Sequence, residues 1–329
     1  MLISVGAMSQ VHIQQGAGVY LQENAGLYLQ GELTSSDNIT GTGSVFMIGD
    51  SIQSINLNGF SIPSIAVNNK KGVSLTGDLT ISNRFSLMDG DVVLNRFILS
   101  LGEDATIENA DEHAIVTNTS GVIRKRADKD LNEYLVPLSN TKNYTPLILS
   151  MRGKYHNGYV ELKSLAKPSP HKPVNAGEYL DNHWTVVSKG IDGKINAIAI
   201  TGNGAGSSPN LSGYLWQDGK WKISPFVAGR ISATIRSGET EIYAMSLNNN
   251  MLQPNPAIDN TTLVYTSEIA TRSQLVVTDS RGRIVHIRSV NIEQGINRYN
   301  LNLDNLVKGY YDVSVIQHGK KTTMKLVKQ

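Results

Sequence analysis

The run Gly18-Val19-Tyr20-Leu21-Gln22 recurs eight residues later as Gly26-Leu27-Tyr28-Leu29-Gln30. Similar short runs follow, up to Phe97-Ile98-Leu99-Ser100-Leu101-Gly102, with Gly or Asn between them every eight to ten residues. Apolar and polar residues alternate within these runs, which is typical of strands that bury one face. Short strands at regular spacing can stack as turns on a continuous core, so the pattern predicts a β-solenoid.

A β-sandwich meander is the alternative, because it would give a similar spacing of strands. Few hairpin dipeptides separate the runs, and this favours the solenoid. Asn58, Asn68-Asn69 and Asn83 fall where a coil must bend, and Asn tolerates a left-handed φ better than most residues. We therefore expect a β-solenoid-like repeat domain over residues 10–126.

The next segment, residues 127–249, differs in composition. It follows the charged run Arg124-Lys125-Arg126 and contains all three tryptophans. Runs such as Thr145-Pro146-Leu147-Ile148-Leu149 and Ile195-Asn196-Ala197-Ile198-Ala199-Ile200 are typical of strands. We expect a second domain here, a β-sandwich, with a linker that ends near Pro256.

The last segment, residues 250–329, predicts a small antiparallel sandwich. The strand-like run Gln274–Asp279 leads to a turn with Gly282, whose missing Cβ permits the positive φ of a tight hairpin. In Tyr311-Asp312-Val313-Ser314-Val315 apolar and polar residues alternate with period two. Several such strands at short spacing indicate an Ig-like β-sandwich. The chain is thus predicted to be all-β in three parts.

Four motifs of this segment stand in a fixed order: Pro254-Asn255-Pro256-Ala257, the D-x-x-G-R-x-V hairpin from Asp279, the L-x-x-G-x-Y-x-V-x-V strand from Leu306, and Lys325-Leu326-Val327-Lys328. Together they resemble the type A C-terminal sorting domain of proteins exported by the Bacteroidetes type IX secretion system. The resemblance implies export through the periplasm and outer membrane, to the cell surface or into the medium.

The resemblance also implies partners, namely the type IX translocon and an outer-membrane shuttle barrel. The positions that match the family's motifs, and that we expect these partners to recognise, are Gly282, Arg283, Gly309, Tyr310, Lys325 and Lys328. Residues 1–9 resemble the end of a signal peptide, with small residues at Ala7 and Ser9 before a cleavage point at Gln10. A buried first strand is the alternative for residues 1–9.

Composition narrows the function classes. The formal net charge is +2 and 18% of the residues are charged. This balance creates no strong positive electrostatic field, so the composition does not predict a nucleic-acid partner. Cysteine is absent, which excludes disulfides, thiol nucleophiles and thiolate metal sites. The seven histidines show no metal-ligand spacing, and no G-x-S-x-G motif is present. We expect no cofactor and no metal.

Two acidic groups of the repeat segment are candidates for chemistry. Asp89-Gly90-Asp91 places two acidic residues two positions apart, but the central Gly favours a turn over a catalytic pair. Asp104, Glu108, Asp111 and Glu112 could hold calcium, although no D-x-D-x-D-G pattern supports this. We therefore expect no catalytic residues and do not predict an enzyme.

The three tryptophans, Trp184, Trp216 and Trp221, could form a carbohydrate-stacking platform, or they could pack the sandwich. The expected role is that of a non-enzymatic cell-surface protein in adhesion or surface assembly, as a partner of larger adhesins such as those of gliding motility. The alternative is a surface protein that binds or cleaves carbohydrate on the solenoid face. An exposed acidic-aromatic cleft on the solenoid would favour carbohydrate, and a smooth apolar patch would favour assembly.

Overall fold

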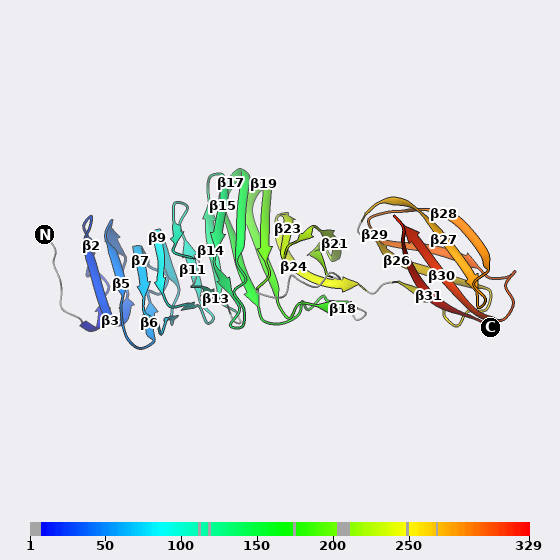
Figure 1. Cartoon of the computed structure of the whole chain (residues 1–329). Helices are drawn as coiled ribbons and strands as arrows, with labels where there is room; N and C mark the ends of the chain where they lie inside the picture. Colours follow the sequence, from blue (N-terminus) through cyan, green and yellow to red (C-terminus); the bar gives the residue numbers. More distant parts are fainter. Residues whose placement is uncertain are drawn as a thin grey trace. The chain divides into compact units, whose positions relative to one another are not determined.

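The computed structural model describes residues 8–110, 113–117, 120–173, 176–202, 211–247, 250–267 and 269–329. These residues form strands and turns and contain no helix (Figure 1), which confirms the all-β prediction. In the part of the chain described, no helix is therefore long and apolar enough to cross a membrane. The chain forms two compact units. Unit 1 is Met1–His171 with Leu180–Ala244, and unit 2 is Lys172–Tyr179 with Met245–Gln329.

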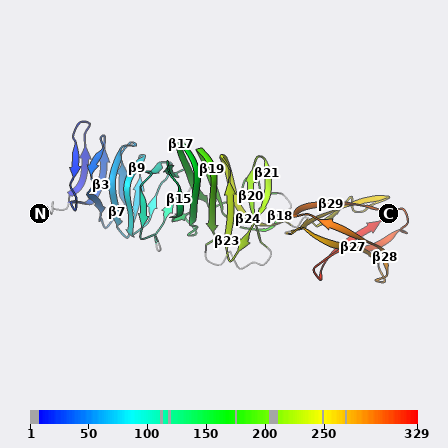
Figure 2. The same cartoon turned by 90° about the horizontal axis from the view of Figure 1, so that it is seen from above.

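Unit 1 begins as a β-solenoid, whose stacked turns are seen from two sides in Figures 1 and 2. Strand register divides it into three faces of parallel strands. The first face contains β1 (Met8–Ile13), the end of β3 (Gly26–Ser35), β6 (Gln53–Asn56), β8 (Val73–Leu75), β10 (Val92–Val93), β13 (Ile115–Val116) and β16 (Leu138–Ser139).

The second face contains the start of β3, β5 (Ser44–Met47), the end of β7 (Ser61–Asn68), the end of β9 (Leu79–Asp89) and β12 (Thr106–Glu108). The third face contains β2 (Val19–Leu21), β4 (Ile39–Gly41), the starts of β7 and β9, β11 (Ile98–Leu101) and β14 (Val122–Ala127). The solenoid prediction is confirmed.

One turn of the solenoid spans 18 to 24 residues, because Gly26 pairs with Ser44 and Ile98 with Val122. The eight-residue spacing seen in the sequence is therefore the step from one face to the next within a turn. Inward side chains form continuous rows, such as Leu33, Ile55 and Leu75, which pair in register and are fully buried. Burial of these rows stabilises the stack by about 25 cal/mol per Å² of apolar surface.

Of the four asparagines expected at bends, Asn58 adopts the left-handed φ, whereas Asn68 and Asn83 lie within strands β7 and β9. Asn58 has φ 49°. Asn69 is buried, and its amide donates hydrogen bonds to Ser51 O (2.8 Å) and to Gln53 Oε1 (2.9 Å). Asn83 lies in β9 between the segments that belong to the third and second faces. Asn side chains thus satisfy backbone groups of the preceding turn as well as tolerating the bend.

The parallel ladder passes into antiparallel strands at β14. This strand pairs with β11 on one edge and with β17 (Leu147–Leu165) on the other. Strand β17 pairs along its length with β19 (His183–Ile200), with a register break between Tyr155 and Tyr159. The other strands of this region are β15 (Leu131–Val136), β18 (Ala176–Tyr179), β20 (Ser212–Gln217), β21 (Lys220–Ser224), β22 (Phe226–Val227), β23 (Arg230–Ile235) and β24 (Gly238–Leu247).

Backbone pairing therefore continues through residue 126, where the sequence predicts a domain limit. The limits 10–126, 127–249 and 250–329 stay predictions. The first seven residues of the expected signal-peptide remnant lie outside the described residues, and Gln10 lies within β1.

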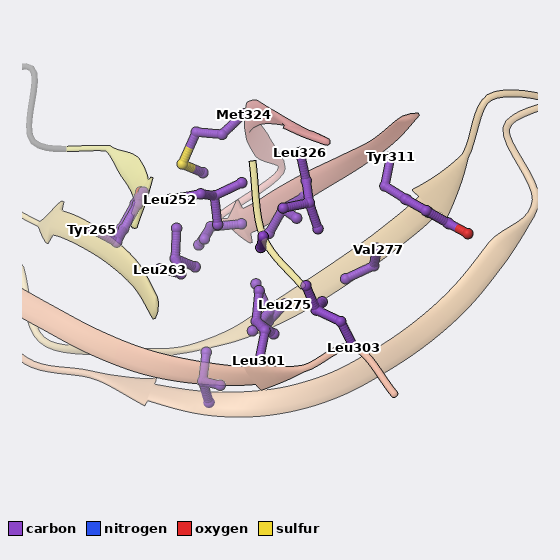
Figure 3. Packing of buried hydrophobic residues seen from close by; sticks show 14 of the residues in the cluster. Leu252, Leu263, Tyr265, Leu275, Val277, Leu301, Leu303, Tyr311, Met324 and Leu326 are labelled. Atoms are coloured by element: carbon purple, nitrogen blue, oxygen red, sulfur yellow. The ribbon is translucent and has the colours of Figure 1, made fainter. Parts of the chain in front are cut away.

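Most of unit 2 is a sandwich of two antiparallel sheets. One sheet contains β25 (Met251–Gln253), β26 (Asn260–Ser267) and β29 (Gly295–Asn302). The other has the order β28 (Ile284–Ile292), β27 (Thr271–Asp279), β30 (Gly309–Gln317) and β31 (Lys320–Lys328). Figure 3 shows the shared core, to which β27 contributes Leu275 and Val277 and β31 contributes Leu326. The arrangement confirms the expected Ig-like sandwich.

Candidate functional site

The six residues expected to direct sorting gather at one end of the four-stranded sheet of unit 2. Gly309 pairs with Lys328, and Tyr310 pairs with Val327. Asp279, the last residue of β27, pairs with Tyr311, so the turn that follows it lies at the same end. We call this region the hairpin end and define it as Ala257–Ile258, Asp279–Val285, Val307–Asp312 and Lys325–Gln329.

The β27–β28 turn is held by one carboxylate. Asp279 Oδ1 accepts hydrogen bonds from the backbone N–H groups of Arg281 (2.9 Å) and Arg283 (3.0 Å). Its Oδ2 accepts from Arg283 Nε (2.8 Å) and lies 2.7 Å from Arg283 Nη2. Desolvation opposes ionisation of this carboxyl, but the hydrogen bonds from Arg283 and Arg281 outweigh it and lower the pKa of Asp279. Arg283 therefore fixes the turn, while most of its guanidinium stays exposed.

The two glycines of the hairpin end act through their backbone torsions. Gly282 has φ +78° and its N–H donates to Asp279 O at 2.9 Å. Gly309 has φ +156°. No atom lies within 4 Å of a Cβ built at either position, so a side chain there would strain the torsion without a clash.

The two lysines differ in their partners. Lys325 Nζ lies 2.7 Å from Asp312 Oδ1 on the neighbouring strand, so its charge is already paired. Lys328 Nζ donates to Gln329 O at 3.2 Å. Both are exposed contacts of a charged group, which are weak and screened by salt.

Exposed apolar side chains at the hairpin end are a feature that the sequence analysis missed. Val307 is 79% and Tyr310 71% exposed, and Ile258, Ile284 and Val285 are exposed as well. Ile258 follows Ala257, which forms a bridge to Lys328, and Ile284 pairs with Thr278 beside the turn. The adjacent pair Ile284-Val285 interrupts the alternating pattern, and this interruption was the signal available in the sequence.

The family comparison identifies unit 2. Residues 251–329 match the sequence model of the secretion system C-terminal sorting domain. This segment is a type IX secretion sorting domain. The chain is therefore cargo of the type IX secretion system; it is exported to the cell surface or secreted, and its sorting domain interacts with the secretion machinery. The type A subclass stays a prediction. The chain matches no curated protein and no solved structure.

The structure buries one of the three tryptophans of the expected platform and leaves the other two partly exposed. Trp184 is fully buried, and its indole N–H donates to Thr145 O at 3.0 Å. Trp184 therefore cannot present a ring face to a ligand. Its assignment to the platform was wrong, and Trp184 is a core residue. The reason is the inward phase of Trp184 in β19, which the composition of the segment does not reveal.

Trp216 and Trp221 are partly exposed and pack against other rings. The imidazole of His171 stacks on Trp216 at 4.4 Å between ring centroids, and Trp221 lies 5.3 Å from Trp216 at a tilt of 59°. The indole N–H of Trp221 donates to His171 O at 2.9 Å. Carbohydrate binding at Trp216 and Trp221 stays a prediction, with part of each ring already used in packing.

The acidic pair of the solenoid lies at a turn. Gly90 has φ +86°, and a Cβ there would lie 1.9 Å from Asn69 O. Asp91 Oδ1 accepts a hydrogen bond from Ala114 N at 2.8 Å, and Asp89 Oδ1 lies 3.7 Å from His113 Nε2. Both carboxylates therefore contact the next turn of the solenoid.

The acidic stretch expected as a possible calcium site is only partly described. Asp104 forms an ion pair with Lys129, and Glu108 lies 4.0 Å from Arg84. Asp111 and Glu112 lie outside the described residues. Among the residues that are described, no group of three or more His, Asp or Glu side chains is placed to hold a metal ion.

A buried lysine is a second feature that the sequence analysis missed. Lys125 is 1% exposed and points inward from β14, between Ile123 and Ala127. Its Nζ donates to Gly102 O (2.5 Å) and Glu103 O (2.8 Å) and lies 5.0 Å from the centre of the Tyr134 ring. Burial lowers the pKa of Lys125 to about 8, although nearby Asp104 opposes this. Its ammonium thus satisfies two backbone carbonyl groups of the preceding turn.

The solenoid also contains an aromatic groove, which we define by Tyr28, Phe46, Ser44, Asn83, Arg84 and Glu23. It has a volume of about 690 Å³ and lies on the second face with the adjoining bends. The rings of Tyr28 and Phe46 stack with their centroids 4.6 Å apart and their planes at 8°. Their separation in sequence hides this pairing, which only the register of β3 with β5 creates.

Proposed function

We propose that the exported chain acts at the cell surface in adhesion or surface assembly, without catalysing a reaction. The supporting observation is that an export domain is joined to a stacked solenoid, an architecture that presents long, rigid rows of outward side chains to partners. The role includes partnership with a larger surface adhesin, such as those used in gliding motility.

The test of this role uses cells that lack the chain and cells that display it. We expect loss of the chain to reduce attachment or spreading on surfaces, and re-expression to restore it. A pulldown from surface membranes with the exported chain should recover a larger surface protein. Unchanged attachment together with an empty pulldown would contradict the proposal.

We propose further that the hairpin end is the surface read by the translocon and the shuttle barrel. Seven of the fourteen large apolar side chains that are exposed among the described residues belong to residues 251–329. Five of these seven lie at the hairpin end, next to the six motif positions. Clustered exposed apolar residues are typical of interaction surfaces. The variants Gly309→Val and Lys328→Ala test this assignment.

Turnover assays with the purified chain would test the proposed absence of catalysis. We expect no turnover of common polysaccharides, peptides or esters by the purified chain. The reason is that Asp91 already accepts a backbone hydrogen bond and Asp89 lies near His113, which suits a structural turn. Turnover that disappears in the double variant Asp89→Asn and Asp91→Asn would contradict this proposal.

Carbohydrate binding is the second candidate, and the aromatic groove is the observation that favours it. Exposed aromatic and acidic residues on the solenoid were the feature that would separate this function from assembly through an apolar patch. The groove combines Tyr28, Phe46 and Glu23 in this way.

A further inference from the structure

We propose that the aromatic groove binds an uncharged glycan, as a short run of neutral pyranose units. The inference rests on the proposed surface role and specifies the ligand class that such a role would use. A pyranose has an apolar C–H side and a rim of hydroxyl groups. A site for it therefore needs an apolar ring surface next to planar hydrogen-bonding groups.

The ring surface is built by strand register. Tyr28 pairs with Phe46, Phe46 with Ala66, and Ala66 with Ser86, so one outward row passes from two rings to two small side chains. Ala66 and Ser86 are buried, so the two rings are the members of these four that keep exposed surface. Tyr28 is 39% exposed, so part of its ring surface is open to a ligand.

A glycine positions these rings. A Cβ built on Gly26 would lie 2.7 Å from Tyr28 Cε2 and 3.0 Å from Phe46 Cε2. The two rings therefore lean over the backbone of Gly26, and any side chain there would displace them. Such a close fit keeps the stack in one orientation before a ligand arrives, which reduces the entropic cost of binding.

Hydrogen-bonding groups also line the groove. Arg84 Nη2 donates to Ser44 Oγ at 3.2 Å, and Arg84 Nε lies 4.0 Å from Glu108 Oε2. Among the described residues Arg84 makes these two side-chain contacts, and a guanidinium has five N–H donors. The remaining donors, with Asn83 and Glu23, are available to hydroxyl groups of a ligand.

The charged side chains in and beside the groove favour a neutral glycan over an acidic one. Glu23 and Arg84 line the groove, and Glu108 lies beside Arg84, so one positive charge is balanced by two carboxylates. An acidic polysaccharide would meet no excess of positive charge here and would be repelled by Glu23. The volume of about 690 Å³ lies within the usual range for ligand sites.

The experiment measures binding of the purified full chain to soluble mannan, xylan, laminarin and dextran, with alginate and polygalacturonate as acidic counterparts. Affinity electrophoresis in native gels and titration calorimetry give the readout. We expect retardation by at least one neutral polysaccharide and none by the acidic pair. Binding of the acidic pair alone, or of none of the six, overturns the proposal.

Variants locate the site. Tyr28→Ala should weaken binding by about tenfold or more, since truncating a central aromatic anchor usually costs at least this much. Gly26→Ala should weaken it also, because it displaces both rings without removing them. The matched control is Tyr20→Ala, which removes an aromatic that is 68% exposed on the third face. Equal effects of Tyr28→Ala and Tyr20→Ala would overturn the proposal, and unfolding midpoints would verify that each variant is folded.

Failure of the groove and failure of the surface role give different results. If deletion of the chain impairs attachment while Tyr28→Ala binds glycan and supports attachment like the unmutated chain, only the groove is wrong. If deletion changes nothing but Tyr28→Ala abolishes glycan binding, the groove is right and the surface role is wrong.

Discussion

The solenoid of unit 1 and the sandwich of unit 2 are both built from short strands in which apolar and polar residues alternate. They differ in the hydrogen bonds that hold the turns between these strands. In the solenoid, Asn95 donates its side-chain amide to Leu75 O (2.8 Å) and Ser74 Oγ (2.9 Å) of the preceding turn. In the sandwich, the β27–β28 turn is closed by Asp279 and Arg283 within five residues. A solenoid bend therefore depends on its neighbour, whereas the hairpin is specified locally.

The two regions also differ in where they leave apolar residues exposed. The solenoid buries almost all of its aliphatic rows, and its exposed aromatics are isolated or lie in the groove. The sorting domain concentrates exposed aliphatic side chains at the hairpin end. Because exposed apolar clusters reduce solubility unless a partner covers them, the difference supports the proposal that the hairpin end, and not the solenoid, is recognised during export.

Removal of β31 should have the largest effect. Deleting residues 320–329 removes Met324 and Leu326 from the sandwich core and the bond from Gln329 N to Ala257 O (2.8 Å). We expect the truncated chain to stay in the periplasm, as measured by cell fractionation and surface proteolysis. The control is the double variant Lys325→Ala and Lys328→Ala, which keeps the strand. Normal surface delivery of the truncation would contradict the role of this strand in export.

Truncating a side chain of the inward rows should destabilise the solenoid strongly. Leu75→Ala removes a fully buried side chain and should reduce the free energy of unfolding by about 2–5 kcal/mol. Met88→Ala, at an exposed position, should change it by less than about 0.5 kcal/mol. Urea unfolding of the purified chain checks this. Because the sorting domain has its own core, a transition assigned to it should not move; if it does, the two units are coupled.

Single substitutions at the hairpin end should separate backbone geometry from charge. Gly309→Val forces a branched residue to adopt φ +156°, a torsion essentially limited to glycine, and should block most export. Lys328→Ala removes an exposed charge and should reduce export only mildly. Quantifying the surface fraction of each variant gives the comparison. Equal and mild effects would mean that recognition is spread over the whole sandwich.

The last prediction concerns the pH dependence of stability that Lys125 causes. Its pKa is about 8 in the folded chain and near 10.5 in the unfolded chain, so between these values the unfolded chain binds more protons. The free energy of unfolding should therefore rise with pH across this window, and below pH 8 the penalty should be constant. Subtracting the profile of Lys125→Met cancels the other titrating groups. A flat difference from pH 8 to 10.5 would show that Lys125 titrates normally.

Local sequence was sufficient wherever the structure depends on neighbouring residues. Alternation within each run predicted the strands, and asparagine and glycine marked bends that the backbone torsions confirm at Asn58, Gly90 and Gly282. The ordered motifs of residues 250–329 predicted the sorting domain, which the family match confirms. These features are local because turn torsions and strand period are properties of a few consecutive residues.

Tertiary structure alone decided what depends on register between distant strands. The stacking of Tyr28 on Phe46, the burial of Trp184 and the burial of Lys125 each follow from which strand lies alongside and in which phase. The hairpin end is assembled in the same way, since the pairing of β30 with β31 brings Gly309 to Lys328. A shift of one residue in any of these ladders would turn each side chain to the opposite face, so composition and motif order could not have located them.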